Sequence, residues 1–397
     1  MVLRDVRGDF PILDRCIGDA PIVYLDSAAT SLTPTPVIDA VTRFYTHYNA
    51  NVHRAVHQLS EEATEAFEGT RIALARLLGA DEDEIVFVRG ATEGVNLVRS
   101  CLPGIRHVVT TIMEHHSNFL PWAYRDETRV VGVTPDGLLD MAELDSVLQG
   151  GFDSGLVAVT HVSNAIGTIN PIGTIIRKAH DAGALVLIDA AQSVPHMPVD
   201  VKALDVDMLV ISAHKMLGPG GVGVLYIKKK LLGELTPWHL GGNIVDQVHR
   251  DHFTLQPGPA RIEAGTPAIE AVIGWGAAID YLAALGLENV QQHEHALVEY
   301  ALSRLADIRN VHIVGPTDAT VRGVGVLFYI DGLEAHSVAR LLSNQSSVLV
   351  RSGYHCAQPL HEALDVLPTV RASFYVYNTT QDIDELAKGL EAIVSLL

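Results

Sequence analysis

The sequence predicts an α/β fold, with a mostly parallel sheet covered by helices on both faces and a smaller α+β domain at the C-terminal end. Two observations predict this fold. Short apolar runs of strand length alternate with segments of helical pattern, which is typical of buried parallel strands joined by crossover helices. The chain is also long enough, at 397 residues of which 48% are hydrophobic, for one large core and a second smaller one.

Five apolar runs are expected to form parallel strands, at residues 84–88, 107–111, 156–160, 185–189 and 208–213. Helical patterns lie between the strands, at residues 141–149 and 172–182. The apolar run 222–227 follows the last of these strands after only a short glycine turn. Because that spacing leaves no room for a crossover helix, this run is expected to pair antiparallel. Ligands of such a sheet bind at the carboxyl ends of its strands.

A long helical pattern over residues 268–285 ends at Gly286. Beyond it the sequence predicts two helices and a strand, at residues 288–304, 335–343 and 324–330. We therefore expect two domains and an N-terminal segment that packs with the smaller one. Their expected bounds are 18–282 for the large domain, 283–397 for the small domain and 1–17 for the segment.

Composition disfavours several classes of partner. The chain has 28 Lys and Arg against 47 Asp and Glu, a formal charge of −19, so a nucleic-acid partner is not expected. No run of 18 or more apolar residues occurs, and residues 1–10 lack an apolar signal segment, so we expect no membrane partner and a cytoplasmic location. The three cysteines form neither a disulfide framework nor metal-ligand spacing, so no metal is expected.

Lys215 and Asp189 are the two most informative residues. Each comes at the end of a predicted strand, where a lysine is usually solvated and an aspartate usually caps a helix. Together they indicate different chemistry. A lysine where water is scarce can form a Schiff base with an aldehyde, and a carboxylate keeps a pyridine nitrogen protonated. Pyridoxal 5'-phosphate (PLP) needs both groups.

The segment Gly218-Pro-Gly-Gly-Val-Gly fits the glycine fingerprint of dinucleotide-binding proteins. That fingerprint must follow a strand and open a helix. Here it follows Lys215 and runs into the strand expected at 222–227. A nicotinamide oxidoreductase is therefore rejected.

Ordered motifs cover nearly the whole chain. They are Tyr24-Leu-Asp-Ser-Ala-Ala-Thr, Asn51-Val-His-Arg-Ala-Val-His, Arg89-Gly-Ala-Thr-Glu-Gly-Val-Asn, Glu114-His-His-Ser-Asn, His161-Val-Ser-Asn-Ala-Ile-Gly-Thr, Ser212-Ala-His-Lys, Glu263-Ala-Gly-Thr-Pro, Arg351-Ser-Gly-Tyr-His-Cys-Ala-Gln-Pro and Arg371-Ala-Ser-Phe-Tyr-Val-Tyr-Asn-Thr. With these motifs the chain resembles the group II (Suf-type) cysteine desulfurases and selenocysteine lyases. These enzymes belong to the class V aminotransferase superfamily of fold-type I PLP enzymes, so the resemblance implies a seven-stranded sheet.

The resemblance implies a role for each residue around the PLP ring. Lys215 would hold PLP as a Schiff base and move the proton on the substrate Cα. Asp189 would pair with the pyridine nitrogen, and His115 would stack on the ring, although a surface His-His pair with its neighbour is the alternative. Gln192 and Asn164 would hydrogen-bond the ring hydroxyl, although Asn164 could instead be a turn residue.

The PLP phosphate is expected at the start of a helix. Ala91 and Thr92 follow the strand 84–88, and Thr92 is expected to be the N-cap of a helix whose free amides bind an anion. By the resemblance, Ser212 and His214 would donate to the phosphate as well. In the family, the threonine that matches Thr266 reaches this site from a second subunit, which implies a homodimer.

The substrate end of the site has one principal candidate. Arg371 is expected to hold the substrate α-carboxylate in a bidentate pair. Arg351, His53 and Arg54 are weaker candidates for lining the same cavity, and Ala28 of the first motif is expected to line it too.

Cys356 distinguishes a desulfurase from an aminotransferase, which needs no cysteine. Its thiolate would attack the sulfur of bound L-cysteine, giving a persulfide and alanine, and nearby His355 and Arg351 are expected to favour the thiolate. A lone cysteine is more often a small buried hydrophobe, and Cys16 and Cys101 are assigned that way. The loop around Cys356 is short, so a sulfur-acceptor protein is expected to dock close to the site.

Several functions stay open. The first is a cysteine desulfurase that supplies sulfur for iron–sulfur clusters or thio-cofactors. A selenocysteine lyase would share the chemistry but needs no cysteine nucleophile. An aminotransferase, an epimerase or a kynureninase-like hydrolase would act on other amino acids, and a scaffold without catalysis is disfavoured by Lys215, Asp189 and His115.

Overall fold

The computed structural model describes residues 3–18, 20–123 and 127–396 of the chain. Its central feature is a seven-stranded sheet with the order β4-β10-β9-β8-β7-β5-β6. The strands are β4 (Ile85–Val88), β5 (His107–Thr111), β6 (Thr128–Val131), β7 (Gly155–Thr160), β8 (Ala184–Asp189), β9 (Met208–Ser212) and β10 (Gly223–Ile227). Strands β9, β8, β7, β5 and β6 are parallel, whereas β10 pairs antiparallel with both of its neighbours. The predicted fold class and the antiparallel strand are confirmed.

The central strands are apolar throughout because both of their faces are buried. In β7, Leu156 and Ala158 belong to one hydrophobic core, and Val157 and Val159 belong to the core on the other face. Strand side chains alternate between the two faces, so a sheet covered on both sides reads as a continuous apolar run. This is why the five predicted strands agree with the structure to within a residue at each end.

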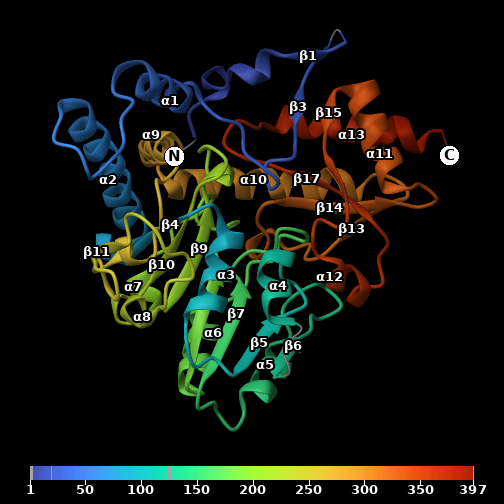
Figure 1. Ribbon diagram of the computed structural model, residues 1–397. Helices are drawn as coiled ribbons and strands as arrows, with labels where there is room; N and C mark the ends of the chain where they lie inside the picture. The colour runs from blue at the N-terminus through green and yellow to red at the C-terminus, as the bar shows by residue number, and fades with distance from the viewer. Residues whose placement is uncertain (1–2, 19, 124–126, 397) are drawn as a thin grey trace.

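Helices cover both faces of this sheet (Figure 1). The helices of this part of the chain are α1 (Thr35–His47), α2 (Gln58–Leu78), α3 (Ala91–Cys101), α4 (His116–Ala123), α5 (Met141–Leu148), α6 (Ile172–Asp181), α7 (Val201–Leu204), α8 (Lys229–Glu234) and α9 (Ile269–Leu285). The next helix, α10 (Leu287–Ala306), places Leu297, Ala301 and Leu305 in the hydrophobic core of the C-terminal part instead. Val95 of α3 lies in the core on one face and Ile175 of α6 in the core on the other. The carboxyl ends of the strands are left for the site.

The C-terminal part of the chain forms a second, antiparallel sheet with the order β13-β14-β17-β16. Its strands are β13 (Val311–Val314), β14 (Gly325–Ile330), β16 (Arg351–Gly353) and β17 (Thr369–Ser373), and its helices are α11 (Ala335–Ser346), α12 (Gln358–Ala363) and α13 (Thr380–Val394). A separate hydrophobic core, with Phe328 and Leu386 among its residues, lies between this sheet and the helices. Strand β17 therefore carries Arg371 from a rigid sheet into the neighbourhood of the large one.

The N-terminal segment contacts residues far along the chain. Arg7 Nη1 pairs with Asp382 Oδ1 at 3.2 Å, and the Phe10 ring packs against Tyr377 and Tyr281.

Three pairs of short strands complete the described fold. They are β1 (Cys16–Ile17) with β2 (Ala20–Pro21), β3 (Val23–Tyr24) with β15 (Val348–Leu349), and β11 (Val245–Val248) with β12 (Phe253–Leu255). The domain bounds stay a prediction, and residues 1–2, 19, 124–126 and 397 within them lie outside the described residues.

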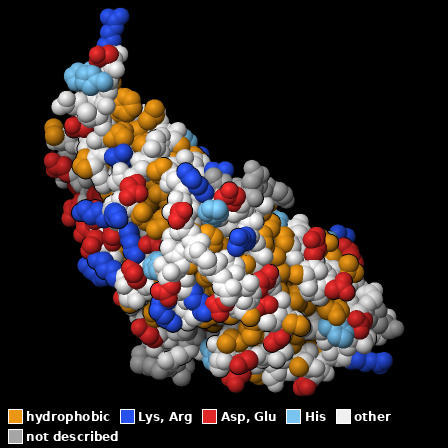
Figure 2. Space-filling model, turned by 90° about the horizontal axis from the view of Figure 1, so that it is seen from below, with side chains coloured by type: hydrophobic (Ala, Val, Ile, Leu, Met, Phe, Trp, Pro, Cys, Tyr) orange, Lys and Arg blue, Asp and Glu red, His pale blue; other side chains and the backbone are white. Residues whose placement is uncertain are grey.

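Acidic and basic side chains are interspersed on the face shown in Figure 2.

In the part of the chain that the structure describes, no single helix is both long and apolar enough to cross a membrane. Helices α9 and α10 meet those limits of length and composition only as a pair, with a bend of 76° between them.

Candidate active site

A cavity of about 200 Å³ lies at the carboxyl ends of β8 and β9, where ligands of open α/β sheets bind. It brings together residues that are far apart in the sequence. The predicted site residues that line it are Ala28, Ala91, Thr92, His115, Asn164, Asp189, Ser212, His214, Lys215, Arg351, Cys356 and Arg371.

Asp189 and Lys215 lie at the ends of adjacent strands. Asp189 is the last residue of β8 and only 5% exposed, and its Oδ1 accepts a hydrogen bond from the Ala191 amide at 3.0 Å. Lys215 ends the single 3-10 turn that follows β9. Burial lowers the pKa of the Lys215 amine and raises that of the Asp189 carboxyl, and each is partly offset by the charge of the other. The same cavity therefore holds a reactive amine and a buried carboxylate.

The start of α3 provides a site for an anion. Gly90 is the N-cap, with a φ of 151°, and Thr92 is the second helical residue, so the prediction of Thr92 as N-cap is wrong. Gly90 takes the cap because a backbone with positive φ favours glycine. Residue 223 is a glycine as well, since a Cβ added to Gly223 would lie 2.6 Å from the Gly90 Cα. Ser212 Oγ accepts from the Ala91 amide at 2.8 Å. The next amides of the first turn have no partner within the helix.

His115 lies in the connection between β5 and α4. The Ser117 amide donates to its Nδ1 at 3.1 Å, so Nδ1 is the unprotonated nitrogen of the neutral ring. Burial, and then the charge of Lys215, lowers the pKa of His115 to about 3, which keeps the ring neutral at physiological pH. Among the described residues, no group of three or more His, Cys, Asp or Glu is arranged to hold a metal ion.

Glu114 was not singled out from the sequence, although it stands in the same motif as His115. It is fully buried, and its Oε1 accepts from the Thr160 amide at 2.9 Å while its Oε2 accepts from Asn118 Nδ2 at 2.6 Å. These bonds fix the connection that carries His115 to β7 and α4. Burial raises the pKa of Glu114 to about 8.

Arg371 is 2% exposed and held at both ends of its guanidinium group. Nη1 donates to the Asn164 carbonyl at 2.6 Å and Nη2 donates to Asp26 Oδ1 at 3.1 Å. Asp26 was not predicted to belong to the site, because in the sequence it is only one polar residue of the Tyr24 motif. Arg351 faces Arg371 across the β16–β17 pair, and both line the cavity. Two guanidinium groups suit an anionic substrate.

Cys356 lies between β16 and α12 and lines the same cavity. Its carbonyl accepts from the His116 amide at 2.9 Å. The expectation that His355 favours the thiolate is wrong. Burial lowers the pKa of His355 to about 2, so the imidazole carries no charge, and its Nε2 contacts Thr369 Oγ1 instead. Arg351 remains as a cation beside Cys356 in the cavity.

Four predicted residues lie outside the cavity lining, namely Gln192, Thr266, His53 and Arg54. Gln192 is buried with its Nε2 bonded to the Ala28 carbonyl at 2.7 Å, so it lies behind Ala28. Thr266 is exposed, and its role in the site of a second subunit stays a prediction.

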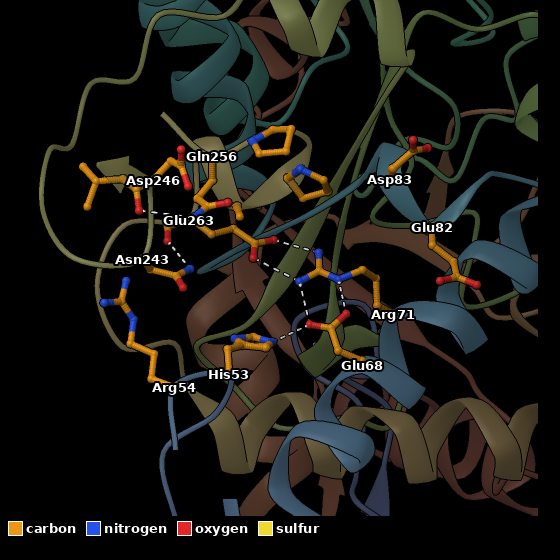
Figure 3. Close-up of a pocket in the computed structure, with 14 residues that line it drawn as sticks. His53, Arg54, Glu68, Arg71, Glu82, Asp83, Asn243, Asp246, Gln256 and Glu263 are labelled. Carbon is orange, nitrogen blue, oxygen red and sulfur yellow. Dashed lines mark hydrogen bonds and ion pairs between the residues drawn. The ribbon is translucent and has the colours of Figure 1, made fainter. Parts of the chain in front are cut away.

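His53 lies in a different cavity of about 600 Å³ (Figure 3). Its Nε2 contacts Glu68 Oε1 at 2.8 Å, and Glu68 in turn pairs with Arg71, which pairs with Glu263. These contacts hold the His53 ring in this second cavity. His53 and its neighbour Arg54 therefore do not line the catalytic cavity of the same polypeptide.

The catalytic cavity fits PLP part by part. The Lys215 amine has the lowered pKa that Schiff-base formation needs. The buried Asp189 carboxylate is costly unless it is paired, and a pyridinium nitrogen would pair it. The free amides at the start of α3 suit a phosphate group, and the neutral His115 ring lines the space between.

Comparison with known proteins decides the family. Residues 23–386 match the family described as aminotransferase class-V. The chain belongs to this family. A probable cysteine desulfurase of Streptomyces coelicolor is 44% identical, over 98% of this chain and 96% of the relative. A cysteine desulfurase of Enterobacter sp. strain 638 is also 44% identical, over 100% of this chain and 99% of the relative.

Solved structures show the same fold. An apo cysteine desulfurase from Thermococcus onnurineus has a TM-score of 0.94 at 38% identity, covering 100% of this chain and 99% of the other. A cysteine desulfurase from Escherichia coli has a TM-score of 0.88 at 34% identity, covering 98% of both chains. The protein is a fold-type I PLP enzyme, and PLP is its cofactor.

Proposed function

We propose that this protein is a PLP-dependent cysteine desulfurase, which converts L-cysteine to L-alanine and captures the sulfur on Cys356. One observation carries the proposal. Cys356 lines the same small cavity as Lys215, Asp189 and Arg371. The full-length relatives at about 44% identity, named cysteine desulfurase or probable cysteine desulfurase, support the same activity.

The residues that line the cavity have separate roles in the proposed reaction. PLP, when bound, supplies an electron sink for the electron pair released at the substrate Cα. Arg371 binds the substrate carboxylate, with Asp26 and the Asn164 carbonyl fixing the plane of its guanidinium group. The Lys215 amine, whose pKa is lowered by burial, removes the Cα proton and later returns a proton to the product. Neutral His115 lines the cavity without adding charge.

The sulfur step balances without an external oxidant or reductant. The Cys356 thiolate attacks the substrate sulfur, so an S–S bond forms as the substrate C–S bond breaks. The electron pair of the broken bond goes to the substrate carbon, which takes a proton and becomes the methyl group of alanine. Thiol plus cysteine therefore gives persulfide plus alanine.

The alternatives differ in what they require of Cys356. A selenocysteine lyase would use the same cavity without this nucleophile. An aminotransferase, an epimerase or a kynureninase-like hydrolase would give Cys356 no reason to lie beside Lys215. Its place in the cavity favours the desulfurase.

Finer features of the function are part of the proposal. The connection from β16 to α12, Gly353 to Gln358, is short, which supports membership of the group II (Suf-type) enzymes and sulfur transfer to a docked acceptor protein. Thr266 is exposed in the single chain, which fits a contact with a second copy in a homodimer. Supply of sulfur for iron–sulfur clusters or thio-cofactors and the cytoplasmic location remain predictions.

The test is to incubate the purified holoenzyme with L-cysteine and a thiol reductant and to measure alanine and sulfide together. We expect equal amounts of both from the wild type and neither from Lys215→Ala. Cys356→Ser is expected to lose activity on cysteine while still binding it. Alanine without sulfide, or full activity of Cys356→Ser, would remove the assignment.

A further inference from the structure

We propose that Thr369, His355 and His361 form a hydrogen-bonded clamp that holds the turn carrying Cys356 in the orientation that sulfur transfer needs. The three are positioning residues, because none of them is required to touch the substrate. The role given to Cys356 rests on the proposed function, whereas the clamp itself is a property of the fold.

The turn at Cys356 has an unusual backbone. His355 and Cys356 have φ angles of 50° and 57°, and the Ala357 amide donates to the Tyr354 carbonyl at 2.8 Å. Two central residues with positive φ and this hydrogen bond are the features of a type I′ turn, which glycine and asparagine favour. Side chains with a Cβ rarely adopt this region, and successive cases persist only when the surroundings determine them. The turn therefore needs an external hold.

The side chain of Thr369 supplies that hold from β17. Its Oγ1 lies 3.1 Å from His355 Nε2 and 3.0 Å from His361 Nε2. His361 Nδ1 lies 3.0 Å from the Ala357 carbonyl, which only accepts, so Nδ1 carries the proton and Nε2 is the acceptor. Thr369 Oγ1 therefore donates to His361 and accepts from His355 Nε2. One hydroxyl joins the residue before Cys356 to the helix after it.

The clamp is buried and uncharged. Thr369 is 0% exposed, His361 1% and His355 4%. Burial lowers the pKa of both histidines, so both rings are neutral and neither sets the charge of the thiol. A buried donor or acceptor that loses its partner costs more than an exposed one. Removal of one hydroxyl would leave two imidazole nitrogens unpaired, so the turn is sensitive to this single group.

The backbone of the turn is tied to the cavity as well. Asn164 Nδ2 donates to the His355 carbonyl at 2.7 Å, and the His116 amide donates to the Cys356 carbonyl. Both donors belong to segments that line the catalytic cavity. The hydrogen bonds of Thr369 thus hold the side chain of His355 and the helix after the turn. The bonds from Asn164 and His116 hold the backbone of the turn against the catalytic cavity.

The experiment compares Thr369→Val, which keeps the shape and removes the hydroxyl, with Thr369→Ser, which keeps the hydroxyl. In the holoenzyme, Thr369→Val is expected to lower kcat for alanine formation by about 10- to 100-fold, because a misplaced nucleophile loses that much rate, while KM for L-cysteine stays within about twofold. Thr369→Ser is expected to restore kcat. Equal losses in both variants, or an unchanged kcat in Thr369→Val, would overturn the clamp.

A second readout is independent of desulfurase activity. Without any substrate, iodoacetamide should alkylate Cys356 about 5- to 10-fold faster in Thr369→Val than in the wild type or in Thr369→Ser, since loss of the bond frees the turn. Cys16 is exposed, so its assignment as a buried residue is wrong, and it serves as the internal reference in the same peptide analysis. If Thr369→Val does not fold, His361→Phe breaks one arm of the clamp and should shift both readouts in the same direction. A folded His361→Phe variant that matches the wild type in both would contradict the proposal. Should the wild type itself release no sulfur, the labelling result still decides the clamp, and only the proposed function fails.

Discussion

Arg371 Nη2 donates to Asp26 Oδ1 at 3.1 Å, and the two residues come from opposite ends of the chain. The bond joins β17 to the segment after β3, and the arginine is almost fully buried. A guanidinium group held in this way cannot turn away from an incoming carboxylate. Recognition of the substrate therefore depends on a residue that does not line the cavity.

Asp26→Ala should raise KM for L-cysteine by about tenfold or more, because a hydrogen bond to a buried charged group is lost. Asp26→Asn keeps an acceptor oxygen for Arg371 and should have a smaller effect. Steady-state kinetics of both variants with the holoenzyme provide the comparison. An unchanged KM in Asp26→Ala would show that the Asn164 carbonyl alone orients Arg371.

Thr92 is expected to donate its hydroxyl to the PLP phosphate at the start of α3. Thr92→Val should weaken PLP binding by about 5- to 10-fold, and Thr92→Ser should bind as the wild type does. The dissociation constant comes from titration of the apoenzyme with PLP, followed by absorbance. Equal affinity in Thr92→Val and Thr92→Ser would mean that the backbone amides hold the phosphate without this hydroxyl.

Acid should destabilise the protein partly through His161. Burial lowers the folded-state pKa of His161 to about 4 from the ordinary value of 6.5. As the pH falls below 6.5, the unfolded chain takes up a proton there that the folded chain does not. The stability from this group is thus present above pH 6.5 and is lost as the pH falls toward 4, by about 1.4 kcal/mol per pH unit within that window.

The check is urea unfolding of the wild type and His161→Gln between about pH 4 and about pH 7.5, a range that spans that window. The variant should lose the His161 share of the slope, and a matched change at exposed His249 serves as the control. Identical slopes in the wild type and His161→Gln would contradict the account of this histidine.

Much of the fold was predictable because the central strands are buried on both faces. The strand at 107–111 was predicted with the bounds it has in β5, since the four residues after His107 are apolar or small and all buried. The edge strand β6 (Thr128–Val131) was not predicted, because Val131 is the only buried residue among its four. Hydrophobic periodicity in a sequence reflects burial, and an edge strand has few buried residues.

The site was predictable where its residues stand in motifs at strand ends, as Lys215 and Asp189 do. The errors have physical causes. The charge of His355 depends on burial, which the sequence does not display, and the cap at Gly90 depends on a φ angle. The contact of His361 with Thr369 joins α12 to β17, and local sequence pattern does not reveal such a tertiary contact.

The most direct measurement of the central claim is mass spectrometry of the Cys356 peptide after the holoenzyme has reacted with L-cysteine without a reductant or an acceptor. The account predicts that this peptide gains one sulfur atom, that alanine appears in equal molar amount, and that the Cys16 and Cys101 peptides are unchanged. Sulfur on either of those cysteines, or alanine formed at the wild-type rate by Cys356→Ser, would contradict it.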